Sequence, residues 1–350
     1  MTSRRPLAFR VRRAHVGALL AAGAAVLAAL VPAAPSSAAG ERYVALGDSY
    51  ASGLGTRDYL DDGTQCRRSA RAYPSLLAAA RGYTLDLRAC SGAVIGDVRA
   101  AQLGALTSAT RYVTVSVGGN DAGFADVLTE CALPGWASDC DRAIDDAQTY
   151  ISSSLGPALG ALYAQVRSRA PQARVVVVGY PRVFMGEDCN ALTWFSPAEQ
   201  SRLNRTADQL NGVLATRARS AGFSFANPTS RFVGHAVCDS PEWLNGLSYP
   251  VEESYHPNVA GHRDGYTPLV GPFLTGATVR ATTSVLQKAE AAAPAQAERQ
   301  ADRARLDRAI EPKEFVAPDL NSPRVRAAAK RLGIDVSDRA EVDRADRRTW

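Results

Sequence analysis

Short runs rich in β-branched residues alternate along this chain with longer stretches of helical periodicity. The runs predict strands at residues 42–46, 84–88, 111–117, 174–179 and 223–226, and the stretches predict helices at residues 73–80, 140–169 and 196–220. The last helix opens with Ser196 and Pro197, and Glu199 stands at the spacing of a capping box. Such alternation is typical of a parallel sheet with helices on both faces. We therefore predict a doubly wound α/β fold on a five-stranded sheet.

The first 39 residues have the composition of an export signal. Five arginines and no acidic residue precede an apolar stretch at residues 16–31, and small side chains follow at residues 36–39. A membrane anchor is the alternative, since the apolar stretch approaches spanning length, but its Ala and Gly content and small-residue exit favour cleavage. The pair Arg4 and Arg5 hints at twin-arginine export. We expect residues 1–39 to be a secretory signal peptide and the mature protein to be extracellular.

Removal of this leader changes the charge balance of the chain. The full sequence has 40 basic and 35 acidic side chains, and without the five leader arginines 35 of each remain. A neutral chain gives no reason to expect a nucleic-acid partner. No later stretch is long and apolar enough to cross a bilayer, so we expect a mature chain without a transmembrane segment, acting as a monomer.

The mature part divides by composition. Residues 40–278 carry the predicted strands and helices and are expected to form the main α/β domain. After about residue 275 the sequence becomes rich in Ala, Arg, Asp and Glu, with prolines between charged segments. We expect residues 279–350 to be a solvated helical or partly disordered extension, with a docking role at the cell surface as the alternative.

Six cysteines follow the leader, and an even number in an exported chain predicts disulfides. They are Cys66, Cys90, Cys131, Cys140, Cys189 and Cys238. The count alone leaves the pairing open, although Cys131 with Cys140 closes the shortest loop. A metal site is disfavoured because no CxxC pair occurs and Cys238 alone has a histidine, His235, at ligand spacing. We expect neither a metal nor another cofactor.

Ligands of open parallel sheets bind beyond the carboxyl ends of the strands. Four segments follow or flank those ends: Gly47-Asp48-Ser49, Ser91-Gly92, Gly118-Gly119-Asn120-Asp121 and Tyr255-His256-Pro257-Asn258. Polar side chains and glycines in these places are candidates for a site, and each has a structural alternative as a helix cap or turn former.

A serine hydroxyl becomes a nucleophile when a base lies within hydrogen-bond distance and donors face the developing oxyanion. Ser49 stands on the turn from the first strand into a helix, where N–H groups are available. His256 has the pKa to take its proton and return it, and the following Pro-Asn predicts a helix start that holds the ring. Gly92 offers a backbone N–H and Asn120 a side-chain amide as oxyanion donors.

Taken in order, these four segments resemble the GDSL/SGNH hydrolase family over residues 42–274. The resemblance implies a three-layer α/β/α fold of flavodoxin-like type. It also implies that Ser49 is the nucleophile and a first oxyanion donor through its own N–H, that Gly92 and Asn120 are the other donors, and that His256 is the base. The cysteine layout is similar to that of secreted actinobacterial lipases, esterases and phospholipases A1, which implies the pairs Cys66–Cys90, Cys131–Cys140 and Cys189–Cys238.

One position departs from the family pattern. Many relatives carry Asp three residues before the histidine, and this chain has Glu253 there. Three groups are candidates for orienting His256 by accepting from its Nδ1–H: the Glu253 carboxylate and the main-chain carbonyls of Glu253 and Ser254. The sequence leaves this choice open.

The resemblance and the residues together predict a secreted serine carboxylic-ester hydrolase, a lipase or esterase, that cleaves acyl esters of lipids or small molecules through a Ser49 acyl-enzyme. A carbohydrate acetyl esterase of the same fold is one alternative. A non-catalytic surface-binding protein is another, since fold does not fix function. The α/β-hydrolase class is disfavoured because the chain has no Gly-x-Ser-x-Gly elbow.

Overall fold

A five-stranded parallel sheet lies at the centre of the computed structural model, which describes residues 40–350. The leader predicted at residues 1–39 lies outside the described residues. The strands are β1 (Arg42–Gly47), β2 (Thr84–Leu87), β3 (Tyr112–Ser116), β4 (Arg174–Val178) and β5 (Ser224–Ala226). Their spatial order, β2-β1-β3-β4-β5, is that of flavodoxin-like folds. All five predicted strands are confirmed, each end within one residue.

The strands form where they do because their side chains are buried on both faces of the sheet. In β4, Val175 to Val178 are at most 3% exposed, and Val113 and Val115 of β3 are fully buried. A continuous apolar run of this kind is characteristic of a parallel strand covered on both sides. The register of β1 against β3 pairs Gly47 with Ser116, so the two strands end together beside the predicted nucleophile.

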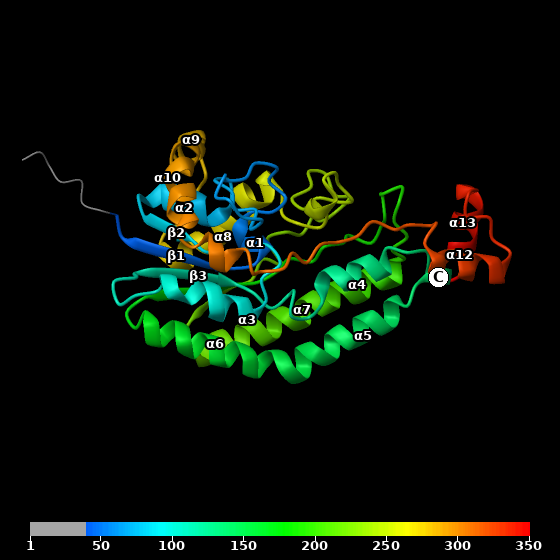
Figure 1. Cartoon of the computed structure of the whole chain (residues 1–350), viewed down its shortest axis with the longest axis horizontal. Coiled ribbons are helices and arrows are strands. Elements are labelled where there is room, and N and C mark those ends of the chain that lie inside the picture. The colour runs from blue at the N-terminus through cyan, green and yellow to red at the C-terminus, as the bar shows by residue number, and fades with distance from the viewer. Residues whose placement is uncertain (1–39) are drawn as a thin grey trace, which may run out of the picture. The chain divides into compact units, whose positions relative to one another are not determined.

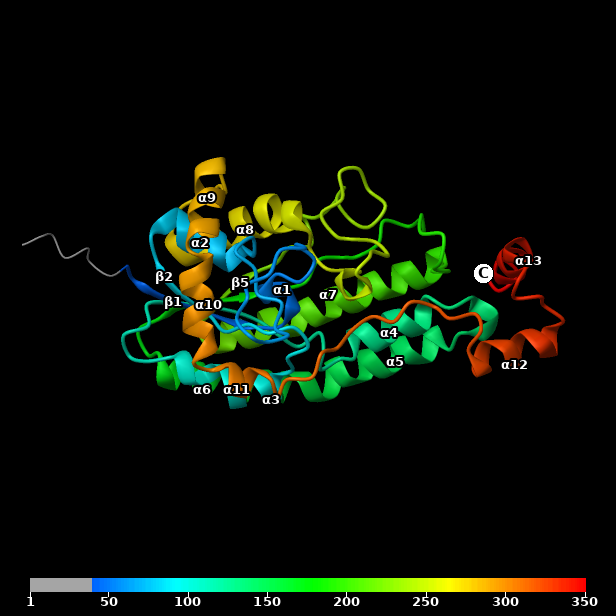
Figure 2. The same ribbon diagram turned by 45° about the horizontal axis from the view of Figure 1, so that its top comes forward.

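Helices cover both faces, which confirms the predicted three-layer class (Figures 1 and 2). One face carries α2 (Tyr73–Arg81) and α8 (Thr267–Thr275), and the other carries α3 (Ile95–Asp97), α6 (Gly156–Arg169) and α7 (Pro197–Ser220). α4 (Phe124–Cys131) and α5 (Cys140–Tyr150) extend this second layer beyond the sheet (Figure 1). The shorter helical segments are α1 (Ser49–Ser52), η1 (Val98–Gln102), η2 (Leu103–Ala105), η3 (Gly135–Ala137), η4 (Ile151–Leu155), η5 (Val251–Glu253) and η6 (Gly261–Tyr266).

The helix predicted over residues 140–169 is present, with one irregularity. α5 passes into the π-helical segment η4 and then into α6 without a break, so the chain stays helical throughout. At the start of α7 the predicted capping box is confirmed. The Glu199 N–H donates to the Ser196 hydroxyl over 3.2 Å, and the Ser196 N–H donates to the Glu199 carboxylate over 2.8 Å.

Three disulfides are present, and they are the three pairs that the resemblance implied: Cys66–Cys90, Cys131–Cys140 and Cys189–Cys238. The first ties the segment before α2 to the segment that follows β2. The second joins the end of α4 to the start of α5. Within residues 40–350, no helix is long and apolar enough to cross a membrane.

The C-terminal extension, which we expected to be solvated and helical or partly disordered, contains helices and several buried side chains. Its helices are α9 (Thr283–Ala291), α10 (Ala293–Ala301), α11 (Ala304–Asp307), α12 (Pro323–Leu332) and α13 (Arg339–Asp346). Gln300, Asp307 and Phe315 are at most 4% exposed, and the extension belongs to the same compact unit as the sheet. Between α11 and α12 the chain runs without regular structure alongside α4 (Figures 1 and 2).

Candidate active site

Ser49 lies at the carboxyl end of β1, on the first turn of α1, and is 6% exposed. Asp48 caps this turn, since its Oδ1 accepts the Tyr50 N–H over 3.0 Å and its Oδ2 accepts the Tyr180 hydroxyl over 2.5 Å. Burial raises the pKa of Asp48 to about 7, and these two hydrogen bonds act in the opposite direction. Asp48 therefore shapes the turn that presents Ser49.

His256 faces Ser49 across the end of the sheet. Its Nε2 lies 2.8 Å from Ser49 Oγ, and its Nδ1 lies 2.9 Å from the main-chain carbonyl of Ser254. Because the carbonyl can only accept, the Nδ1 carries the proton and the Nε2 lone pair points at the hydroxyl. Burial of the ring, which is 7% exposed, lowers the pKa of His256 to about 4, with a smaller opposing effect of the Ser254 carbonyl.

The turn that carries His256 is fixed on several sides. Tyr255 holds a left-handed φ of 62°, unusual for a side chain of this size, and is fully buried. The Tyr50 hydroxyl donates to the Tyr255 carbonyl over 2.7 Å, and Asn245 exchanges main-chain hydrogen bonds with Tyr255 and His256. After His256, the Asn258 side chain accepts the Gly261 N–H over 3.0 Å at the start of the next helix, which confirms the predicted helix start.

Within residues 40–350, the Glu253 carboxylate makes no hydrogen bond to the imidazole. Its carboxylate is 1% exposed and accepts the Tyr59 hydroxyl over 2.5 Å and the Arg57 Nε–H over 3.2 Å. Of the three candidate orienters, the Ser254 carbonyl is the one within hydrogen-bond distance of Nδ1 among residues 40–350. Glu253 instead links the turn that carries His256 to the loop that follows α1.

The two predicted oxyanion donors lie on neighbouring loops. Asn120, beyond β3, uses one amide N–H to bond the Ala93 carbonyl over 3.1 Å, so it is tied to the residue after Gly92. Gly92 has a left-handed φ of 83°. Within residues 40–350, neither the Ser49 N–H nor the Gly92 N–H donates to another main-chain or side-chain acceptor. Preformed donors without partners are what a developing oxyanion requires.

An apolar pocket opens beside Ser49 and His256. Its walls come from α4, η4 and α7, and the lining includes Phe124, Val127, Ile151, Leu203 and Leu210. Ser49, Asn120 and His256 lie on its lining together with Asp48, Tyr180 and Lys313. The helical period in the sequence marks such side chains as core, so nothing in the sequence separates the pocket wall from ordinary packing. Tyr180 and Lys313 were likewise not predicted as residues of the site.

Within residues 40–350, the two other histidines, His262 and His235, have structural surroundings. The Nδ1 of His262, a fully buried residue, accepts the Tyr73 N–H over 3.3 Å, and burial lowers the pKa of His262 to about 3. The ring of His235 stacks on Trp243 at 3.6 Å. Asp121 accepts the Ile95 N–H over 3.1 Å. None of these groups hydrogen-bonds to Ser49 or His256 within residues 40–350.

The chain is similar to known proteins over the same region. The sequence model of the GDSL-like Lipase/Acylhydrolase family matches residues 45–263. "Lipase 1" of Streptomyces coelicolor is 44% identical over 255 residues, which are 72% of this chain and 94% of that relative. "Lipase" of Streptomyces rimosus is 42% identical and matches 72% of this chain and 91% of its own.

Two solved structures agree with this similarity. The extracellular lipase of S. rimosus superposes with a TM-score of 0.62 at 43% identity, covering 65% of this chain and 97% of its own. A phospholipase A1 of Streptomyces albidoflavus superposes with a TM-score of 0.63 at 42% identity, covering 66% of this chain and 98% of its own. Both relatives are matched almost end to end, so this chain has residues without a counterpart in them, and the family match ends well before the extension.

Proposed function

Because the chain belongs to the GDSL-like lipase/acylhydrolase family and is thereby a carboxylic-ester hydrolase, we propose that Ser49 is its nucleophile and His256 its general base. The observation that supports this most directly is the 2.8 Å distance between His256 Nε2 and Ser49 Oγ, at the polar end of an apolar pocket. The distance and the assigned tautomer suit proton transfer from the hydroxyl to the ring.

The proposed reaction has two halves. Ser49 Oγ attacks the ester carbonyl while its proton passes to His256 Nε2, and the negative charge on the carbonyl oxygen is stabilised by the N–H groups of Ser49 and Gly92 and the amide of Asn120. The alcohol leaves with the proton from His256, and an acyl-Ser49 ester remains. Water then attacks this ester while His256 takes its proton. The acid leaves as that proton passes from His256 to Ser49 Oγ, which restores both groups. The Ser254 carbonyl holds the imidazole in place through Nδ1–H.

The apolar pocket supports a proposal for the substrate class. An apolar cavity lined by α4, η4 and α7 suits an aliphatic acyl chain, and the relatives above are named lipases and a phospholipase A1. We propose acyl esters of lipids or small esters as substrates. We also propose that the protein is secreted, because three disulfides suit an oxidising compartment and residues 1–39 have the pattern of a signal peptide.

Purified protein of residues 40–350 should hydrolyse p-nitrophenyl esters, with kcat/KM depending on acyl length. A fluorophosphonate should add one phosphonyl group to the protein, found on the Ser49 peptide by mass spectrometry. Ser49→Ala and His256→Ala should each lower kcat by about a thousandfold or more while circular dichroism stays unchanged. Turnover by the folded Ser49→Ala variant near the wild-type rate would reject the assignment.

Export has its own test. Fusion of residues 1–45 to a reporter should place the reporter in the medium of an expressing bacterium, and reversing the charge of Arg4 and Arg5 should reduce that yield. Retention of the reporter inside the cell with the intact leader would contradict secretion.

A further inference from the structure

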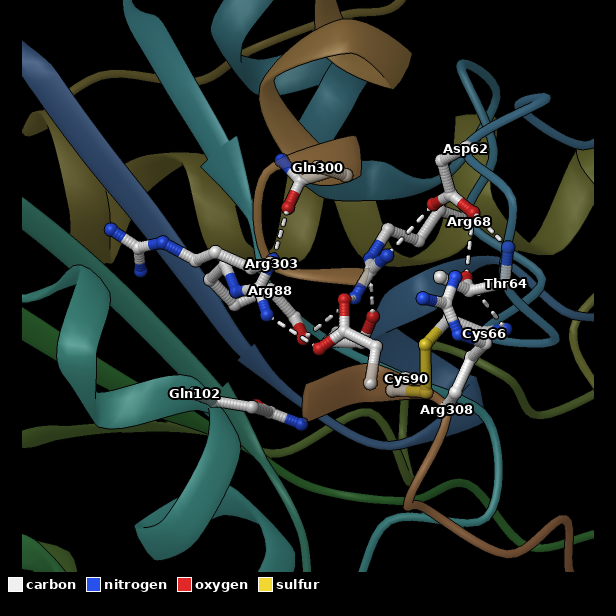
Figure 3. Close-up of polar contacts among 12 residues, drawn as sticks. Asp62, Thr64, Cys66, Arg68, Arg88, Cys90, Gln102, Gln300, Arg303 and Arg308 are labelled. Atoms are coloured by element: carbon white, nitrogen blue, oxygen red, sulfur yellow. Dashed lines mark hydrogen bonds and ion pairs between the residues drawn. A yellow bond between two sulfur atoms is a disulfide. The ribbon is translucent and has the colours of Figure 1, made fainter. Parts of the chain in front are cut away.

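The extension is joined to the catalytic part through a buried ion cluster at the edge of the sheet (Figure 3). Asp307, at the end of α11, accepts from Arg68 over 2.8 Å and from Arg88 over 2.5 Å, and all three side chains are 0% exposed. Asp62 and Gln300 complete the cluster with bonds of 2.7 Å to Arg68 and to Arg88. This cluster fixes the position of Asp307, from which the chain continues toward α12.

Beyond Asp307 the chain crosses the mouth of the candidate active site. Ile310 is buried against the Cys66–Cys90 disulfide and Ala93, on the loop that carries Gly92. Phe315 is 4% exposed and packs edge-to-face on Tyr255, the neighbour of His256, with ring centroids 4.9 Å apart. We name residues 310–316 the strap. It runs from the loop of one proposed oxyanion donor to the turn of the proposed base.

Contact between the strap and the Gly92 loop is close. A Cβ placed on Gly92 would lie 2.2 Å from the Glu311 carbonyl oxygen and 2.8 Å from the Lys313 main-chain nitrogen, so the backbones touch where only glycine fits. The far end is held by the Val316 N–H, which donates to the Thr129 hydroxyl of α4 over 2.9 Å. A segment fixed at both ends in this way forms part of the wall of the site.

Lys313, in the middle of the strap, lines the pocket with Ser49, Asn120 and His256. Among the described residues that line it, Lys313 is the one ammonium or guanidinium, and the carboxylate of the lining, Asp48, is occupied by Tyr50 and Tyr180. No carboxylate of residues 40–350 forms an ion pair with Lys313 within 4.0 Å. Lys313 is exposed, so a cationic side chain lies at the rim of a pocket whose other charged lining residue is the hydrogen-bonded Asp48.

Resting on the function proposed above, we propose that Lys313 is a specificity-determining residue that favours esters with an anionic group, phosphate or carboxylate, on the alcohol side. The apolar pocket accommodates the acyl chain, since burying a charge there is costly. An anionic group on the alcohol stays at the mouth, where the Lys313 ammonium can pair with it. The strap thus adds a substrate contact from a part of the chain that lies outside residues 45–263, the region that the family model matches.

The test uses two chromogenic esters of similar size, one anionic and one neutral: 4-butyryloxy-3-nitrobenzoate and 4-butyryloxy-3-nitrobenzamide, both at monomeric concentration. The measured quantity is the ratio of kcat/KM for the anionic ester to that for the neutral one. Lys313→Ala should lower this ratio about 3- to 5-fold, as expected for an exposed ion pair, mainly through KM of the anionic ester. Lys313→Glu should lower it further, and Lys313→Arg should restore it.

The chain provides matched controls, because its three lysines, Lys288, Lys313 and Lys330, all lie in the extension. Lys288→Ala and Lys330→Ala remove exposed charges away from the strap and should leave the ratio unchanged. Raising the salt concentration should reduce the wild-type ratio and leave that of Lys313→Ala nearly constant. The product 4-hydroxy-3-nitrobenzoate should inhibit the wild type more strongly than Lys313→Ala.

A second pair of substrates separates the sources of the anion. Dibutyrylglycerol 3-phosphate and dibutyrylglycerol, followed by acid release, test a lipid phosphate in place of a carboxylate, and the same decrease in ratio with Lys313→Ala is expected. An unchanged ratio with both pairs, or equal losses on neutral and anionic esters, would overturn the role of Lys313. No hydrolysis of either neutral ester by the wild type would instead overturn the function proposed above.

Discussion

Asp307 provides a sharp test of how the extension is held. Its carboxylate is 0% exposed and bridges two buried guanidinium groups, Arg68 and Arg88, that come from sequence positions more than 200 residues away. With Asp62, the cluster has two positive and two negative charges. Asp307→Asn keeps the size of the side chain but removes one charge. It also turns an N–H₂ donor toward one of the guanidinium groups, which are themselves donors.

The expected cost follows from this geometry. Removal of one partner from a buried ion pair leaves an uncompensated buried charge and typically costs about 3–5 kcal/mol. Proteins of about 150–250 residues lose roughly 2–4 °C of Tm per kcal/mol, so Tm should fall by roughly 6–20 °C. The strap begins directly after Asp307, and the extension should therefore become sensitive to protease before the sheet unfolds.

The assay is urea unfolding followed by circular dichroism with the disulfides intact, together with limited proteolysis mapped by mass spectrometry. Asp302→Asn is the matched control, since Asp302 is exposed on the same extension, and it should stay within about 0.5 kcal/mol of the wild type. A free energy of unfolding for Asp307→Asn within about 1 kcal/mol of the wild type, with no earlier cleavage after α10, would refute the reasoning.

Three further predictions concern the site itself. Since burial lowers the pKa of His256 to about 4 and the base must be neutral, the acid limb of kcat/KM should lie near pH 4, and a limb near pH 6.5 would contradict the buried ring. Glu253→Gln should change kcat less than about tenfold, because the Ser254 carbonyl orients the ring, and a thousandfold loss in steady-state assays would assign that task to the carboxylate. Asn120→Ala should lower kcat by about 100- to 1000-fold with little change in KM, and retained turnover would remove its amide from the proposed oxyanion site.

The sheet could be predicted closely because its signal is local. The run Val175 to Val178 and the residues that follow each strand lie within a few positions of one another, so spacing alone indicates a buried strand and what stands at its carboxyl end. Parallel strands bring those ends to one edge, and this is why Ser49, Asn120 and His256 could be named together before any distance was known. The capping box of Ser196 and Glu199 is local for the same reason.

The choice of orienter was not decided by the sequence. Glu253 and Ser254 are adjacent, and which of them reaches Nδ1 depends on the left-handed turn at Tyr255 and on Tyr59 and Arg57, which draw the carboxylate away. The apolar pocket was also hidden, because Phe124, Ile151 and Leu203 have the helical period of ordinary core residues.

The C-terminal extension shows most clearly what could not be predicted from the sequence. Its composition, rich in charged residues and interrupted by proline, predicted a solvated segment. Composition alone does not indicate which residues will pair in space. Asp307 is buried because it pairs with Arg68, which is 239 positions away in the sequence but adjacent in space. Ile310 and Phe315 are buried because they pack on the Gly92 loop and on Tyr255. The sequence by itself determined which elements form and which residues stand at the strand ends, since those depend on neighbours along the chain. Tertiary structure alone decided what covers them, since charge pairing and burial depend on neighbours in space.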